Sequence, residues 1–290
     1  MAVVDLRTGE FRWLTDSAPT SADPAKLIEP ELVSYPGDEG HEIPAFLYRP
    51  VGAAEPLGVL ISIHGGPKHQ ERPAYINEGF YQYLLSQGIA VVAPNIRGSS
   101  GYGMTYQKRI NRNSLGNCDL ADLAATARYV LSQEWVDTGR IGLFGASYGA
   151  FVVLSCVARL PEFRWAAAVD FFGPSNLVTV AEAVPPAYRA TAIEVIGDPE
   201  VDRESLLARS PIAYAENIKT PLFVVQGARD RRVPQAESDQ LVEKLRDLGV
   251  EVRYDIYPDE GHGFTRSSSQ TKAYVDAAEF LIAHLRNTAS

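Results

Sequence analysis

The sequence has few of the residues that would assign it to several common protein classes. Its 290 residues include only two cysteines, Cys118 and Cys156, which is too few for a disulfide framework in a chain of this length. We therefore expect two reduced, mostly buried thiols. The five histidines form no HExxH pattern and the cysteines form no CxxC pair. The sequence thus predicts neither a metal site nor a cofactor.

Long apolar runs and basic clusters are also missing. No run approaches the roughly 18 apolar residues that a membrane span needs, and the N-terminal MAVVDLRTGEFRW lacks the basic start and apolar centre of a signal peptide. The formal net charge is −9, and no run of Lys and Arg offers a surface for phosphates. We expect a cytoplasmic protein that binds neither membranes nor nucleic acids.

Short apolar segments alternate with helical patterns through most of the chain. This alternation is typical of βα units that wind a mostly parallel sheet, and segments that are apolar throughout indicate helices on both faces. The expected strands are GVLISIHG (58 to 65), IAVVAPN (89 to 95), RIGLFG (140 to 145), WAAAVDFFG (165 to 173), PLFVVQG (221 to 227) and VEVRYDIYP (250 to 258). The expected helices lie near 77 to 87, 119 to 134, 148 to 159, 235 to 248 and 270 to 287.

Three segments depart from this alternation. Residues 31 to 50 are typical of an antiparallel hairpin that turns at Gly37 to Gly40. Residues 174 to 215 are too long for an ordinary connection and predict a short helical excursion over one end of the sheet. In residues 1 to 30, VVDLRTGEFRWLTDS predicts two strands that turn at Thr8 and Gly9, followed by a polar stretch.

Ser147 lies in FGASYGAF, a GxSxG match between an apolar strand and a helical segment. This strand, turn and helix setting is that of a nucleophile elbow, in which the serine occupies a strained backbone conformation. Gly145 and Gly149 suit it because larger side chains would collide with the neighbouring strand and helix. The match predicts that Ser147 is a nucleophile.

A serine nucleophile needs a base, and the base needs a carboxylate that orients it. In an α/β-hydrolase fold the acid and then the histidine follow the serine along the chain, each on a loop after a later strand. Asp230 in QGARDRRVP and His262 in DEGHGF meet this requirement. Asp170 also ends a strand and is a rival acid, although a capping role suits it better.

An oxyanion hole in this fold uses the backbone N–H that follows the nucleophile and a second N–H from an early glycine-rich loop. Tyr148 supplies the first. The second is assigned to Gly66 in His64-Gly65-Gly66-Pro67, since proline has no N–H. His64 is interpreted as a structural residue of this loop, with a role as a second base as the alternative.

Five motifs follow one another along the chain: HGGP, NIRGSSGYG (95 to 103), GASYGAF, GARDRRVP and DEGHGF. Together they resemble the C-terminal hydrolase domain of the prolyl oligopeptidase family. Within that family they are most similar to the acylaminoacyl peptidase and dipeptidyl aminopeptidase branch. The resemblance covers about residues 30 to 288 and is more specific than GxSxG alone. The resemblance implies Ser147, Asp230 and His262 as a catalytic triad, Gly66 and Tyr148 as oxyanion donors, and Arg232 at the substrate site.

The sequence departs from the family in two places. Members often have GGSYGG, whereas this chain has Ala150 and Phe151 after Gly149, a small change that leaves the nucleophile intact. The β-propeller that normally precedes the hydrolase domain is not in this sequence, and residues 1 to 30 resemble the remnant of its final blade. We expect the α/β-hydrolase domain to cover residues 31 to 290. Whether the chain is a truncated piece or a natural single-domain relative is left open.

The function predicted from these observations is a serine hydrolase that cleaves peptides or acyl-aminoacyl substrates through an acyl-enzyme. Without the propeller the site would be open, so a carboxylesterase that acts on small acyl esters is the alternative. A non-catalytic module of the same fold, and acyl transfer to an acceptor other than water, are further alternatives. The expected partner is a small-molecule or short-peptide substrate. The N-terminal hairpin has an apolar side, which we expect to pack onto its own domain or onto a second subunit of a homo-oligomer.

Overall fold

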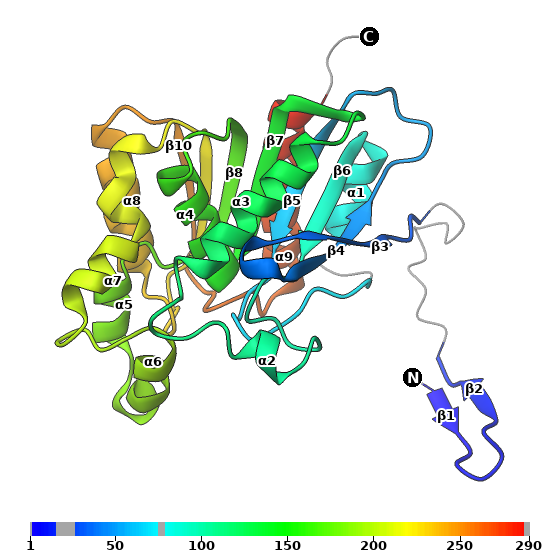
Figure 1. Ribbon diagram of the computed structural model, residues 1–290, viewed down its shortest axis with the longest axis horizontal. Coiled ribbons are helices and arrows are strands. Elements are labelled where there is room, and N and C mark those ends of the chain that lie inside the picture. The colour runs from blue at the N-terminus through cyan, green and yellow to red at the C-terminus, as the bar shows by residue number, and fades with distance from the viewer. Residues whose placement is uncertain (1, 16–26, 75–78, 287–290) are drawn as a thin grey trace.

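A twisted open sheet forms the centre of the protein (Figure 1). The computed structural model describes residues 2–15, 27–74 and 79–286. Within these ranges, eight strands form one sheet in the order β10-β9-β8-β7-β5-β6-β4-β3. The strands are β3 (Glu31–Pro36), β4 (Glu42–Tyr48), β5 (Leu57–Ile63), β6 (Ile89–Pro94), β7 (Val136–Ala146), β8 (Trp165–Phe171), β9 (Leu222–Gly227) and β10 (Val252–Tyr257).

The direction of the strands places the functional loops at one edge. β3 and β4 form the antiparallel hairpin expected from the sequence, and β4 also runs antiparallel to β6. The other neighbouring strands are parallel. β5 pairs with β6 on one side and with β7 on the other, so the winding of the chain reverses there. Ligands of such sheets bind beyond the carboxyl ends of the strands near this reversal.

The inner strands form because their sequences are apolar on both faces. Every residue of β5, β6 and β9 is buried. An alternating pattern would have indicated one solvated face, whereas continuous burial requires helices on both sides. Two apolar clusters, one on each side of the sheet, meet this requirement.

Helices cover both faces of the sheet (Figure 1). The first cluster contains side chains of α3 (Cys118–Leu131), α4 (Tyr148–Arg159) and α8 (Gln235–Asp247). The second contains side chains of α1 (Phe80–Ser86) and α9 (Ser267–Leu285). The fold class predicted from the sequence, a mostly parallel sheet between two helical layers, is confirmed. A further short helix, α2 (Met104–Gln107), follows β6.

The segment after β8 forms the predicted helical excursion. Figure 1 shows its helices at the same end of the molecule as α2, which follows the carboxyl end of β6. Helix α8 contacts the last element of this segment. The excursion consists of α5 (Leu177–Ala183), α6 (Arg189–Val195), α7 (Arg203–Arg209) and the 3-10 turns Pro186–Tyr188 and Pro211–Asn217.

The N-terminal hairpin consists of β1 (Ala2–Val4) and β2 (Phe11–Trp13), which pair antiparallel as predicted. Figure 1 shows it to the side of the sheet. Its large apolar side chains are exposed, with Leu6 95% and Trp13 69% accessible. The expectation that it packs onto its own domain is therefore wrong for this structure. Burial against a second subunit stays a prediction, which a monomeric mass in light scattering would contradict.

Candidate active site

Ser147 lies in a sharp turn between β7 and α4. Its φ is +58°, a left-handed conformation that a serine adopts only with support from its surroundings. The two glycines of the motif allow the turn to pack closely. A Cβ on Gly145 would lie 2.4 Å from the backbone carbonyl of Gly149, and one on Gly149 would lie 2.1 Å from the backbone oxygen of Ile63. The strand, turn and helix geometry expected of GxSxG is present.

The three residues predicted as a triad meet in one hydrogen-bonded chain. Nε2 of His262 lies 2.8 Å from Oγ of Ser147, and Nδ1 of His262 lies 2.6 Å from Oδ2 of Asp230. They follow β7, β9 and β10, whose carboxyl ends share one edge of the sheet. A carboxylate only accepts hydrogen bonds, so Nδ1 carries the proton and Nε2 is free to accept the serine proton.

Asp230 is fixed in place by its own loop. Its Oδ1 accepts hydrogen bonds from the backbone N–H groups of Arg232 (2.8 Å) and Val233 (2.9 Å). Its side chain is fully buried, whereas 11% of the side chain of His262 is exposed. One carboxylate oxygen is thus occupied by the backbone and the other by the imidazole. The side chain of Arg232 is exposed on the same loop.

Asp170, the rival acid, has a different role. Its Oδ1 accepts a 2.8 Å hydrogen bond from the backbone N–H of Gly173, three residues further on. This bond caps the turn that follows β8, and the histidine bonds Asp230 instead. Burial raises the pKa of Asp170 to about 7.

The first glycine-rich loop lies beside the serine turn. A Cβ on Gly65 would lie 3.2 Å from the backbone oxygen of Ala146, which immediately precedes Ser147. Gly66 has a φ of +138°, and a Cβ there would lie 2.7 Å from the backbone nitrogen of Lys68. Of the two residues predicted as oxyanion donors, Gly66 therefore belongs to a loop that packs against the serine turn, and Tyr148 directly follows Ser147.

His64 is held within this loop by two hydrogen bonds. Nδ1 lies 2.7 Å from the backbone oxygen of Gly65, and Nε2 lies 2.8 Å from Oγ of Ser99. Both ring nitrogens are therefore occupied, and burial lowers the pKa of the imidazole. These contacts favour the interpretation of His64 as a structural residue over that of a second base.

Comparison with known proteins identifies the family to which this chain belongs. The prolyl oligopeptidase family matches residues 78–288, which is more than half of the chain. The chain belongs to the prolyl oligopeptidase family. It is 36% identical over 237 residues to dipeptidyl aminopeptidase BIII of Pseudoxanthomonas mexicana, covering 80% of this chain and 34% of that protein. It is 29% identical over 255 residues to the acylamino-acid-releasing enzyme of Sus scrofa, covering 85% of this chain and 34% of the relative.

Solved structures of family members share the fold. A puromycin-hydrolyzing peptidase of Mycobacterium tuberculosis superposes with a TM-score of 0.88 at 26% identity, covering 98% of this chain and 44% of that chain. The acylaminoacyl peptidase of Pyrococcus horikoshii gives a TM-score of 0.83 at 26% identity, covering 98% of this chain and 46% of the other. The fold is thus the α/β-hydrolase domain of this family. The chain spans about a third of the length of the curated relatives named above.

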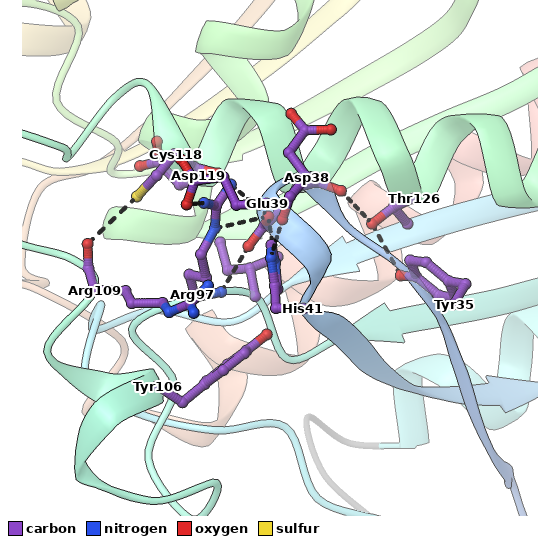
Figure 2. A network of polar contacts seen from close by, with 12 residues as sticks. Tyr35, Asp38, Glu39, His41, Arg97, Tyr106, Arg109, Cys118, Asp119 and Thr126 are labelled. Carbon is purple, nitrogen blue, oxygen red and sulfur yellow. Dashed lines mark hydrogen bonds and ion pairs between the residues drawn. The ribbon is translucent and has the colours of Figure 1, made fainter.

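A buried polar network supports the family motif NIRGSSGYG (Figure 2). The backbone N–H and Nε of Arg97 donate to the two oxygens of Asp122 in α3, at 2.8 and 2.9 Å. Nε2 of His41, which follows the hairpin turn, lies 3.0 Å from the same carboxylate. Ser99 in this motif contacts His64, so the network fixes a segment that is hydrogen-bonded to the glycine-rich loop.

Tyr148 makes a buried contact that the sequence did not indicate. Its hydroxyl donates a 2.7 Å hydrogen bond to Oδ2 of Asp119 at the start of α3. Oδ2 also accepts from the backbone N–H of Gly116 and Oδ1 from that of Leu120. Burial raises the pKa of both side chains. The residue after the serine is thereby tied to a second helix.

Where the structure describes the chain, no group of three or more His, Cys, Asp or Glu side chains is arranged to hold a metal ion. Over those ranges, no helix is long and apolar enough to cross a membrane. Cys118 and Cys156 are both free thiols, as predicted, and Cys156 is fully buried.

Proposed function

We propose that this chain is a serine hydrolase that cleaves peptides or acyl-aminoacyl substrates through an acyl-enzyme on Ser147. The observation that carries the proposal is the continuous hydrogen-bonded chain from Ser147 through His262 to Asp230. Membership of the prolyl oligopeptidase family and likeness to an aminopeptidase and an acylamino-acid-releasing enzyme support it.

The reaction begins when Oγ of Ser147 attacks the acyl carbonyl carbon. As the new bond forms, the serine proton passes to Nε2 of His262, and Asp230 stabilises the resulting imidazolium and holds its ring. The imidazolium then protonates the leaving nitrogen or oxygen, so the scissile bond breaks and an acyl-enzyme is left. Water, deprotonated by His262, attacks this ester and releases the acid, and the proton returns to Ser147.

The negative charge that develops on the carbonyl oxygen needs fixed donors. We assign the backbone N–H groups of Gly66 and Tyr148 to this role. Two observations support this assignment. Gly66 belongs to the loop whose Gly65 packs against the serine turn, and Tyr148 begins α4, where the first N–H groups of a helix have no partner within the helix. The helix dipole adds to the stabilisation of a nearby negative charge. Arg232, exposed beside Asp230, is proposed to contact the substrate.

A carboxylesterase is the second candidate function. The observation in its favour is that Ser147 is only half-buried, so a compact ester can reach its hydroxyl. An activated ester also needs less protonation of its leaving group by His262 than an amide does. Both candidates use the same residues, and they differ in the ratio of amide to ester turnover.

The test compares p-nitrophenyl esters with aminoacyl anilides on one preparation. We expect both to be hydrolysed and Ser147→Ala to abolish both activities together with labelling by a fluorophosphonate probe. A matched control is Ser268→Ala, which removes the hydroxyl of an exposed serine in the first turn of α9.

The outcomes separate the candidates. Anilide turnover that depends on Ser147 supports a peptidase, and ester turnover with no anilide turnover supports the carboxylesterase. A folded wild-type protein that neither turns over a substrate nor takes the label would favour a non-catalytic module. Activity of Ser147→Ala close to that of the wild type would overturn the nucleophile assignment.

A further inference from the structure

Phe172, the first residue after β8, has an unusual backbone conformation. Its φ is +46°, in the left-handed region that a bulky aromatic residue rarely adopts. Among the residues that the structure describes, only Glu39 and Ser147 also have a positive φ without being glycine. Strained residues of this kind persist only where their neighbours hold them, and they cluster at functional sites.

The turn around Phe172 shows what holds it. The backbone N–H of Phe172 donates a 2.8 Å hydrogen bond to the backbone oxygen of Val225 in β9. The next residue, Gly173, donates to Oδ1 of Asp170 at 2.8 Å. A Cβ on Gly173 would lie 2.6 Å from Cβ of Ala150, so the turn is packed closely against α4. Phe172 is thus fixed between two bonds and a tight contact.

The result of this conformation is a contact with the base of the proposed triad. The ring of Phe172 lies 4.9 Å from the imidazole of His262, measured between centroids, at an interplanar angle of 56°. It also packs edge-on against Phe264, two residues after the histidine. The preceding residue, Phe171, accepts a 2.8 Å hydrogen bond from the backbone N–H of Ser147. Two successive residues therefore contact the serine and the histidine.

We propose that Phe172 is a positioning residue, whose ring holds the imidazole of His262 in the orientation that directs Nε2 at Ser147. This inference rests on the proposed function. Of the two hydrogen bonds of the imidazole, the one at Nδ1 leads to a carboxylate that the backbone fixes, whereas the one at Nε2 leads to a serine hydroxyl, which can rotate. The ring can therefore still tilt and carry Nε2 out of line with Oγ of Ser147. The contact with the ring of Phe172 restrains this tilt.

The residue type suits that task. Phe172 is only 8% exposed, so its ring has few alternative positions. An aliphatic side chain could fill a similar volume, but it offers no flat surface for the imidazole and no aromatic pairing. Catalysis is sensitive to such restraint, because a displacement of about 1 Å can cost a factor of about 100 in rate.

The experiment compares Phe172→Leu with two controls. Phe172→Tyr keeps the aromatic ring. Phe280→Leu removes another phenylalanine that packs against a histidine, His284, in α9, with ring centroids 4.7 Å apart and an interplanar angle of 46°. For each variant we measure kcat and KM with a p-nitrophenyl ester, and the downfield proton NMR signal of the Nδ1 proton shared between His262 and Asp230 in the absence of substrate.

We expect Phe172→Leu to lower kcat about 10- to 100-fold while KM changes less than about threefold, and to broaden or shift the Nδ1 signal. Phe172→Tyr should restore kcat to within about threefold of the wild type, and Phe280→Leu should change neither measurement. If Phe172→Leu does not fold, as judged by circular dichroism, Phe172→Met replaces it, because Met is flexible and adapts to irregular space.

Two results would overturn the inference: wild-type kcat and an unchanged Nδ1 signal in the folded Phe172 variant, or an equal loss in Phe280→Leu. The NMR signal is recorded without turnover, so it separates this inference from the proposed function. An inactive wild-type protein with a normal Nδ1 signal that responds to Phe172→Leu would contradict the proposed function, and the ring contact would still be supported.

Discussion

The hydroxyl of Tyr148 and the carboxylate of Asp119 form a 2.7 Å hydrogen bond between two helices, and both side chains are buried. Tyr148 is the residue after the proposed nucleophile, and Asp119 lies in the first turn of the neighbouring helix α3. Three hydrogen-bond donors compensate the buried carboxyl of Asp119 for the hydration that it loses on folding. Removal of one donor leaves one carboxyl oxygen without full compensation, which destabilises the folded protein. The bond therefore stabilises the turn that carries Ser147.

Tyr148→Phe should destabilise the protein by about 1 to 3 kcal/mol and leave kcat within a few-fold of the wild type. The variant removes the donor to Asp119 and keeps the backbone N–H that we assign to the oxyanion hole. Urea unfolding and ester kinetics measure the two effects. Tyr188→Phe, at a side chain that is 68% exposed, is the control and should change neither. A large loss of kcat with unchanged stability would contradict this division.

Gly149→Ala should lower stability by about 3 kcal/mol and abolish most of the activity. The added Cβ would lie 2.1 Å from the backbone oxygen of Ile63 and 2.8 Å from that of His64, so the glycine-rich loop has to shift away from Ser147. Thermal unfolding and fluorophosphonate labelling measure the outcome. Gly139→Ala, at an exposed position in β7, is the matched control. Wild-type labelling of Gly149→Ala would show that this contact does not fix the loop.

Asp230→Asn should lower kcat by about 1,000- to 10,000-fold while the fold is kept. Asparagine can still accept the two backbone hydrogen bonds at Oδ1, but its amide group favours the tautomer of His262 that has no free Nε2 lone pair. Ester kinetics and circular dichroism test this. Asp247→Asn, at an exposed position at the end of α8, should have wild-type kinetics. Loss of less than about tenfold in Asp230→Asn would argue against the assigned acid.

Much of the site could be predicted because it depends on local order. Each functional residue follows a strand, and parallel strands bring their carboxyl ends to one edge of the sheet. The positions of Ser147, Asp230 and His262 after three predicted strands were therefore sufficient to bring them together. The start of β7 was predicted four residues too late, at 140 instead of Val136, because VDTG is polar and contains a glycine.

The supporting contacts could not be predicted, because they join residues that are distant in the sequence. Tyr148 and Asp119 are 29 residues apart, and Arg97 and Asp122 are 25 apart. No local pattern marks such pairs, since a buried Asp in a helix is equally compatible with several partners. The conformation of Phe172 has the same origin. The sequence VDFFG suggests only that the strand ends, and the left-handed φ comes from the packing of the turn against β9 and α4.

Asp170 provides a test of pH dependence. Burial raises its pKa from 3.8 to about 7, and Oδ2 has no hydrogen-bond partner among the described residues. The native carboxyl therefore keeps its proton up to about pH 7, whereas in the unfolded chain it loses the proton near pH 4. Between these values the native state binds more protons, so the contribution of Asp170 to stability falls as the pH rises and is lowest above pH 7.

Asp170→Asn should remove this dependence, because asparagine keeps an oxygen acceptor for Gly173 and does not ionise. We expect the variant to be no more stable than the wild type at pH 4, and its advantage to grow through pH 7 to at most about 4 kcal/mol. Urea unfolding of both proteins at pH 4.5, 6 and 8 measures the difference. Taking that difference cancels Glu71, whose pKa burial also raises to about 7. A difference that stays constant across the series would show that Asp170 ionises near its ordinary pKa in the native protein.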